Sequence, residues 1–203
     1  MTHRPSKHEV DLLKLLARFK PIDDVENVLA WFKTRVPSVA PYAYLNTIYK
    51  PASPDIRLKT ARELEFTQSL ERFYERYNGA CLFVDRLSID GLVDLDAPYE
   101  RVDRFRLQPF RIAEANAEFA TDLSSRGLIC IGSYGFDRSL VCVKKADESV
   151  VCFRGTNFNR VRCEWDSFNG WLSSEVLRLA SMHDDSGVIQ VDESLTPPEQ
   201  SLH

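Results

Sequence analysis

Three short apolar runs near the middle of the chain follow one another with gaps too short to hold a crossover helix. They are residues 128–133, 139–144 and 149–154. The residues between them, GFD at 135–137 and ADE at 146–148, are typical of turns. Because parallel strands need a connection of a dozen or more residues, this spacing predicts an antiparallel meander.

Helical periodicity dominates the N-terminal third of the chain. Apolar residues recur at helical spacing in residues 6–20, 23–35 and 60–78, so we predict a helix in each. Asn78 and Gly79 then form a strong stop signal, because both residues readily take the left-handed conformation at a helix C-terminus.

Four further elements surround the meander. Residues 80–84 and 86–89 are typical of strands, and residues 111–123 and 166–182 are typical of amphipathic helices. Together with the meander, they predict an α+β fold in which a mostly antiparallel sheet is flanked by helices.

Composition divides the chain into three parts. Residues 1–55 form a predicted N-terminal helical extension that ends in a linker with prolines at positions 37, 41, 51 and 54. Residues 56–182 form the main domain. Residues 183–203 hold five acidic residues and no lysine or arginine, and we predict that this acidic tail is disordered.

Charge and hydropathy exclude several classes of protein. The formal net charge is −4, and no basic stripe of the kind found in nucleic-acid-binding proteins is present. No apolar run approaches the roughly 18 residues needed to span a membrane. The N-terminus lacks the apolar core of a signal peptide, so we predict a cytoplasmic protein that contacts neither nucleic acid nor membrane.

The cysteines indicate a core role. There are five, and none forms a close pair in the sequence, which argues against a secreted disulfide framework. Cys130, Cys142 and Cys152 lie inside apolar runs, where cysteine behaves as a small hydrophobic residue.

The chain offers few residues for known catalytic chemistry. Its four histidines are His3, His8, His183 and His203, so none lies between residues 9 and 182. A nucleophile activated by histidine needs that histidine within hydrogen-bonding reach, and zinc sites draw on closely spaced Cys and His. We therefore predict a protein that is not an enzyme, with no catalytic residue, no cofactor and no bound metal.

Residues 85–103 are rich in carboxylates. This segment holds Asp85, Asp90, Asp94, Asp96, Glu100 and Asp103. A solvated acidic surface is the simplest interpretation. A sharper one is a partner-binding face formed by Asp94, Asp96 and Glu100. A third is a metal-dependent hydrolase, since paired carboxylates can hold divalent cations or act as acid and base.

Aromatic residues cluster near the last predicted helix. Phe168 and Trp171 lie at a spacing that usually packs a helix against a sheet, and we expect both in the core. Trp165 precedes this helix and is a candidate partner-binding residue, because tryptophan is enriched in protein-binding hot spots.

Three segments carry motifs in a fixed order. Residues 70–92 hold Phe-Tyr and Asn-Gly patterns that lead into two strands, the second closing at glycine. Residues 131–143 hold an Ile-Gly strand and a turn with aspartate, and residues 165–176 begin with a Trp-x-Ser-Phe pattern. This order resembles the SUKH superfamily (Smi/Knr family). The matching positions are Phe73, Tyr74, Asn78, Gly79, Gly91, Gly132, Asp137, Phe168 and Trp171.

The resemblance implies a function as well as a fold. SUKH proteins include bacterial immunity proteins, which neutralise a cognate toxin such as a nuclease, and fungal cell-wall-assembly regulators. It implies an α+β domain that binds a protein partner and has no catalytic set. We therefore expect an immunity protein, with an intracellular regulatory scaffold and a metal-dependent hydrolase as the alternatives.

Overall fold

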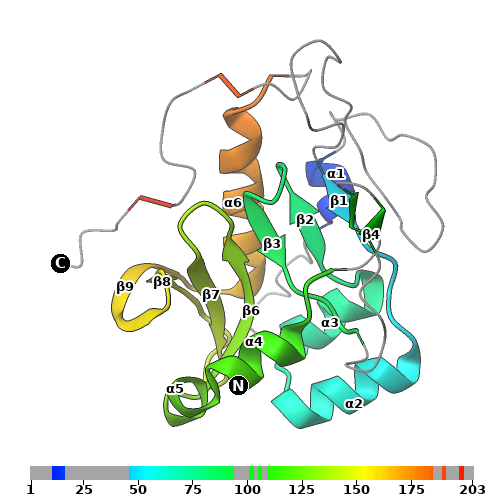
Figure 1. Ribbon diagram of the computed structural model, residues 1–203, viewed down its shortest axis with the longest axis vertical. Coiled ribbons are helices and arrows are strands. Elements are labelled where there is room, and N and C mark those ends of the chain that lie inside the picture. The colour runs from blue at the N-terminus through cyan, green and yellow to red at the C-terminus, as the bar shows by residue number, and fades with distance from the viewer. Residues whose placement is uncertain are drawn as a thin grey trace, which may run out of the picture.

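The computed structural model describes residues 11–16, 46–93, 101–102, 105–106, 109–184, 189–190 and 197–198. These residues form an α+β fold, as predicted (Figure 1). The helices are α1 Leu12–Leu15, α2 Pro54–Leu64, α3 Gln68–Arg76, α4 Ile112–Glu118, α5 Ala120–Ser125 and α6 Phe168–Ser181. The strands are β1 Thr47–Ile48, β2 Ala80–Leu82, β3 Leu87–Ile89, β4 Arg101–Val102, β5 Phe105–Arg106, β6 Leu128–Tyr134, β7 Ser139–Lys144, β8 Val150–Arg154 and β9 Asn157–Trp165.

Seven of these strands form one sheet in the order β1-β2-β3-β6-β7-β8-β9, and every neighbouring pair in it is antiparallel. Strands β6, β7 and β8 are the predicted meander, which is confirmed. The sequence did not predict β9, because polar residues dominate this strand at the end of the sheet. Strands β4 and β5 pair separately.

The predicted single helix over residues 60–78 is wrong: the structure has two helices there. Ser53 begins α2, and its Oγ accepts a hydrogen bond from the backbone N–H of Ile56 at 3.4 Å. Glu65 ends α2 in the left-handed conformation, with φ of 55°. Glutamate favours helices, so Glu65 itself does not mark this break, and the local signal is Thr67, which is the N-cap residue of α3.

One face of the sheet is covered by α6, which Figure 1 shows in orange, together with α3 and α1. These helices and the sheet enclose the larger hydrophobic cluster, the main core. Phe168 and Trp171 of α6 are buried in it, as predicted. Ser167 caps the helix, because its Oγ accepts a hydrogen bond from the N–H of Gly170 at 3.2 Å. The core of the domain therefore lies mainly between α6 and the sheet.

The opposite face of the sheet carries a smaller apolar cluster under α4 and α5. Phe119 and Leu123 from the helical side pack there against Cys130, Phe153 and Phe158. All five cysteines of the chain are free and buried, which confirms the core role predicted for Cys130, Cys142 and Cys152.

The motif residues near α3 join this helix to the end of β3. The side chain of Asn78 accepts a hydrogen bond from the N–H of Leu92 at 2.6 Å and donates one to its carbonyl oxygen at 3.3 Å. Tyr74 Oη donates to the carbonyl oxygen of Asp90 at 2.7 Å. Gly79 has φ of 80°, and a Cβ there would lie 2.4 Å from the carbonyl oxygen of Ile89. Gly79 therefore allows its backbone to approach that of β3, and Asn78 binds the backbone just after this strand.

The described parts of the N-terminal segment and of the acidic tail contact the main domain. Leu12 and Leu16 are fully buried in the main core, and β1 pairs with β2. In the tail, His183 and Pro197 are buried, and the Pro197 carbonyl oxygen accepts a hydrogen bond from Arg162 at 3.0 Å. The predicted helical extension over residues 1–55 and the predicted disorder of residues 183–203 stay predictions, because most of both segments lies outside the described residues. The predicted helix at 23–35 and the rest of the tail lie outside the described residues.

Asp11 fastens α1 to α3. Its Oδ1 accepts hydrogen bonds from the N–H of Leu13 at 3.1 Å and from Tyr77 Oη at 3.2 Å, and its Oδ2 lies 3.3 Å from Arg76 Nη2. Burial alone would raise the pKa of Asp11, but the backbone N–H of Lys14 and the charge of Arg76 lower it below its usual value. Asp11 therefore stabilises the fold as a carboxylate.

We expect Asp11→Ala to lower the free energy of unfolding by about 1–2 kcal/mol at pH 7, because a cap and an ion pair are lost. The folded-state pKa is lowered, so this contribution is complete above about pH 4 and is lost as the pH falls through the lowered pKa. Urea unfolding of both proteins at pH 7 and at about pH 3 measures the change. A difference between the two proteins that is the same at both pH values would contradict it.

Candidate functional site

A groove of about 740 Å³ crosses the sheet face beside α4. Two turns form its rim, residues 83–86 between β2 and β3 and residues 135–138 between β6 and β7. The strands and α4 supply the remaining wall. Side chains of both charges and several aromatic rings line the groove, namely Asp85, Arg86, Phe110, Glu118, Phe119, Tyr134, Phe136 and Arg138.

A smaller hollow of about 220 Å³ extends the groove along α4. Phe110, Glu118 and Ser133 line both spaces, so the two are continuous. Asp90 and Arg111 also line the smaller hollow, and both side chains are largely buried. The groove thus runs from the two turns to charged residues deep beside α4.

The first rim turn has an unusual backbone. Phe83, Val84 and Asp85 are three successive residues in the left-handed region, with φ of 53°, 60° and 59°. This conformation costs roughly 1–2 kcal/mol per residue, and Val84 is β-branched, which makes the conformation still less favourable. Strained backbone of this kind clusters at functional sites, so the turn is a candidate for function.

Contacts on both sides hold this turn in place. The N–H of Phe83 donates to Asn46 Oδ1 at 3.0 Å, and the buried Phe83 ring stacks on His183 with centroids 5.1 Å apart. The second turn touches the first directly, because the N–H of Gly135 donates to the carbonyl oxygen of Arg86 at 3.3 Å. The two halves of the rim therefore form one unit.

The second rim turn exposes an aromatic side chain. Phe136 is 66% exposed, the highest value among the large hydrophobic side chains of the described residues. Asp137 holds this turn: its Oδ1 accepts from the N–H of Ser139 at 3.0 Å, and its Oδ2 lies 2.9 Å from Arg162 Nη2. The chain thus fixes the backbone beside Phe136 and leaves the ring in solvent.

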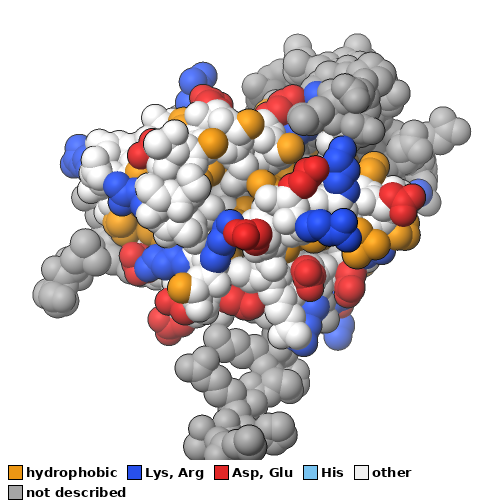
Figure 2. Space-filling view, turned by 90° about the horizontal axis from the view of Figure 1, so that it is seen from below, with side chains coloured by type: hydrophobic (Ala, Val, Ile, Leu, Met, Phe, Trp, Pro, Cys, Tyr) orange, Lys and Arg blue, Asp and Glu red, His pale blue; other side chains and the backbone are white. Residues whose placement is uncertain are grey.

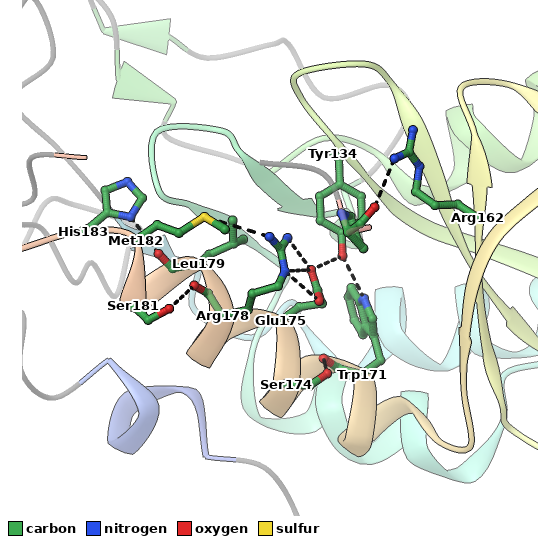
Figure 3. A network of polar contacts seen from close by, with 11 residues as sticks. Tyr134, Arg162, Trp171, Ser174, Glu175, Arg178, Leu179, Ser181, Met182 and His183 are labelled. Carbon is green, nitrogen blue, oxygen red and sulfur yellow. Dashed lines mark hydrogen bonds and ion pairs between the residues drawn. The ribbon is translucent and has the colours of Figure 1, made fainter. Parts of the chain in front are cut away.

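A buried polar network supports the groove from the α6 side (Figure 3). Tyr134 is the last residue of β6, and its Oη donates a hydrogen bond to Glu175 Oε2 at 2.8 Å. Trp171 Nε1 donates to the same Tyr134 oxygen at 3.4 Å. Arg178 closes the network, with Nη2 at 2.7 Å and Nε at 3.0 Å from the Glu175 carboxylate.

Two groups of this network, Tyr134 and Arg178, have raised pKa values. Burial and the adjacent Glu175 carboxylate raise the pKa of Tyr134 well above its ordinary value. Burial alone would lower the pKa of Arg178, but its hydrogen bonds to Glu175 and the charge of that carboxylate raise it. A phenol that stays neutral and a guanidinium that stays charged suit a support better than a proton-transfer pair.

The predicted site residues fall into three groups. Asp94, Asp96, Glu100 and Asp103 lie outside the described residues. Asp85 is exposed on the groove rim and Asp90 is buried in the smaller hollow. Trp165 is partly buried and packs against the main core. Within the described part of the chain, no group of three or more His, Cys, Asp or Glu residues could hold a metal ion.

Most of the groove residues were not predicted from the sequence. Arg86, Glu118 and Arg138 come from three segments that are far apart in the chain, and single charged residues carry no signal of their own. Phe136 had a weak signal, since it is a large apolar residue in a turn-like GFD stretch. The contact between the two turns could not be inferred from local patterns.

The surface of the molecule has mixed charge on the side that carries α2, α4 and α5. Figure 2 shows that side, where lysine and arginine side chains alternate with aspartate and glutamate, and hydrophobic side chains lie between them. No patch of one sign dominates this face.

Comparison with models of known protein families finds no match for this sequence, and comparison with curated proteins finds none either. Among the helices that the structure describes, none has both the length and the apolar character required to cross a membrane.

Arg138 allows a direct test of strain at the rim, because it is exposed and has φ of 56°. We expect Arg138→Gly to be more stable than Arg138→Ala by about 1 kcal/mol, since only glycine takes this conformation without strain. Both variants remove the side chain, so each is the control for the other. Urea unfolding measures the difference, and an alanine variant as stable as the glycine variant would show that the turn is unstrained.

Proposed function

We propose that this chain is a protein-binding domain whose partner is a cognate protein toxin, so that it acts as an immunity protein. The groove between the two rim turns and α4 receives a segment of the toxin. The observation that carries this proposal is Phe136, an aromatic side chain that is 66% exposed on a turn held by fixed contacts. Exposed aromatic rings beside arginines are typical of binding hot spots.

The charges around the groove support a protein segment as the ligand. Arg86 and Arg138 can pair with carboxylates of a partner, and Asp85 and Glu118 can pair with its basic residues. A surface with both signs fits the mixed side chains of a polypeptide. A groove of about 740 Å³ has room for several side chains.

The rigidity of the rim supports inhibition. A protein that blocks a toxin needs a preorganised surface, because ordering flexible segments on binding reduces affinity. The Asp137–Arg162 ion pair and the Tyr134–Glu175 hydrogen bond hold the β6–β7 turn from below. The motifs that resemble the SUKH superfamily lead to the same class of function. In this proposal, the carboxylates of Asp94, Asp96 and Glu100 speed association with a basic toxin.

The test compares two equally exposed residues. Phe136→Ser should weaken toxin binding by about 30-fold, the effect of losing a hot-spot contact worth about 2 kcal/mol. Leu58→Ser is the matched control, because Leu58 is 65% exposed on α2 and does not line the groove. It should change the affinity less than about threefold.

The toxin for this experiment is the product of a toxin-like reading frame next to the gene. Growth of cells that express it with each variant, together with the dissociation constant of the purified complex, gives the result. Equal binding and equal protection by wild type and Phe136→Ser would rule out the groove. A toxin that binds neither wild type nor control would count against the immunity function itself.

A further inference from the structure

Two pairs of cysteines lie directly opposite each other in the sheet. Cys130 of β6 faces Cys142 of β7, and Cys152 of β8 faces Cys163 of β9. Residues directly opposite in antiparallel strands have Cα atoms about 4.5–5.5 Å apart and side chains on the same face. A disulfide requires Cα atoms about 4.4–6.8 Å apart, so the register of both pairs meets this requirement.

The side chains within each pair share a face of the sheet. The opposing thiol contributes to the raised pKa of Cys142 in the first pair and of Cys152 in the second. The first pair lies in the cluster under α4 and α5, and the second lies in the main core. The two pairs are therefore on opposite faces of the sheet and would react independently.

The fifth cysteine provides an internal comparison. Cys81 of β2 lies opposite Thr47 and Ser88, and its Sγ accepts a hydrogen bond from Tyr49 Oη at 3.7 Å. It is buried like the others but has no cysteine across from it. Burial alone therefore does not distinguish the paired cysteines; their register does.

We propose that the Cys130–Cys142 and Cys152–Cys163 pairs are two sites of reversible disulfide formation. In each, two S–H bonds break and one S–S bond forms. Two protons and two electrons pass to a disulfide oxidant such as glutathione disulfide, which becomes two glutathione thiols. The exchange proceeds through a mixed disulfide in which one cysteine thiolate attacks the oxidant and the second cysteine releases glutathione.

The fold sets the order in which the pairs react. The opposing thiol and burial raise the pKa of Cys152, and burial and the opposing thiol raise that of Cys142. Few thiolates therefore form in the closed sheet, and oxidation requires local opening. Among the strands that the structure describes, β9 ends the seven-stranded sheet and pairs with β8 alone, whereas β6 and β7 are each paired on both sides. The Cys152–Cys163 pair, at the sheet end, thus oxidises first.

The experiment treats the folded, reduced chain with glutathione disulfide and follows the intact mass with time. We expect a loss of about 2 Da, followed more slowly by a second loss of about 2 Da, with the full mass restored by dithiothreitol. Peptide mapping of the wild-type chain should find the first cross-link between Cys152 and Cys163 and the second between Cys130 and Cys142.

Variants separate the two pairs. Cys163→Ser should lose about 2 Da in total, and Cys81→Ser should lose as much as wild type. Mapping of the wild type needs no variant to fold, so it decides the outcome alone if a substitution disrupts the core. An unchanged mass after prolonged oxidation, stable glutathione adducts on the paired cysteines, or cross-links to Cys81 would each overturn the proposal.

Discussion

Replacing Glu175 with leucine should lower the free energy of unfolding by about 3–5 kcal/mol, because it removes one partner of a buried charge pair. The Glu175 side chain is only 4% exposed and accepts hydrogen bonds from Tyr134 and Arg178. Without it, the Arg178 guanidinium loses its ion-pair partner and the Tyr134 hydroxyl loses its acceptor. Urea unfolding monitored by tryptophan fluorescence measures the loss, since Trp171 belongs to the same network.

A second substitution is the control for this prediction. The double variant Glu175→Leu, Arg178→Met removes both charges and should recover a large part of the stability, because apolar residues often replace a buried ion pair without net loss. If Glu175→Leu alone unfolds like wild type, the network does not support the groove. The same conclusion would follow if the double variant were as unstable as the single one.

Gly132→Ala should also be strongly destabilising, by about 3 kcal/mol. A Cβ at position 132 would lie 2.0 Å from the carbonyl oxygen of Ser88, which is backbone and cannot move without shifting β3. Strand β3 pairs with β6 at Ser88↔Ser133 and Ile89↔Gly132, so Gly132 lies in the short ladder between these two strands. The substitution therefore disrupts the pairing of β3 with β6, which joins strands β1–β3 to strands β6–β9.

Gly127→Ala is the matched control for Gly132→Ala. Gly127 precedes the same strand and has nothing within 4 Å of the position of a new Cβ. Its φ of +61° still favours glycine, so we expect a loss of about 1 kcal/mol from backbone strain alone. Equal losses at the two positions, measured by urea unfolding, would show that close approach of β3 and β6 is not what requires Gly132.

The fold was predictable where local patterns match local structure. The meander of β6, β7 and β8 and the helix α6 follow directly from apolar spacing and from the capping Ser167. The break at Glu65 and the strand β9 were not predictable. A left-handed glutamate has the sequence of a helical one, and β9 has a mostly polar sequence whose pairing with β8 depends on tertiary structure.

The candidate site was less predictable than the fold. Asp94, Asp96 and Glu100 were predicted as site residues because carboxylates are dense in their segment. The described groove is instead formed by two turns that are separated by about 50 residues in the sequence. Left-handed φ at Val84 has no signal in the sequence, because valine disfavours it. The hydrogen bond between Tyr134 and Glu175 was not predictable either, since Glu175 is an ordinary polar residue in an amphipathic helix.

Hydrogen exchange of the complex with the cognate toxin tests the central claim most directly. The amides of residues 83–86 and 135–138 should exchange more slowly in the complex than in the free chain, because the toxin segment covers both rim turns. The amides of α2 should exchange at the same rate in both. Protection of α2 or β9 with unchanged exchange at the two turns would contradict the account.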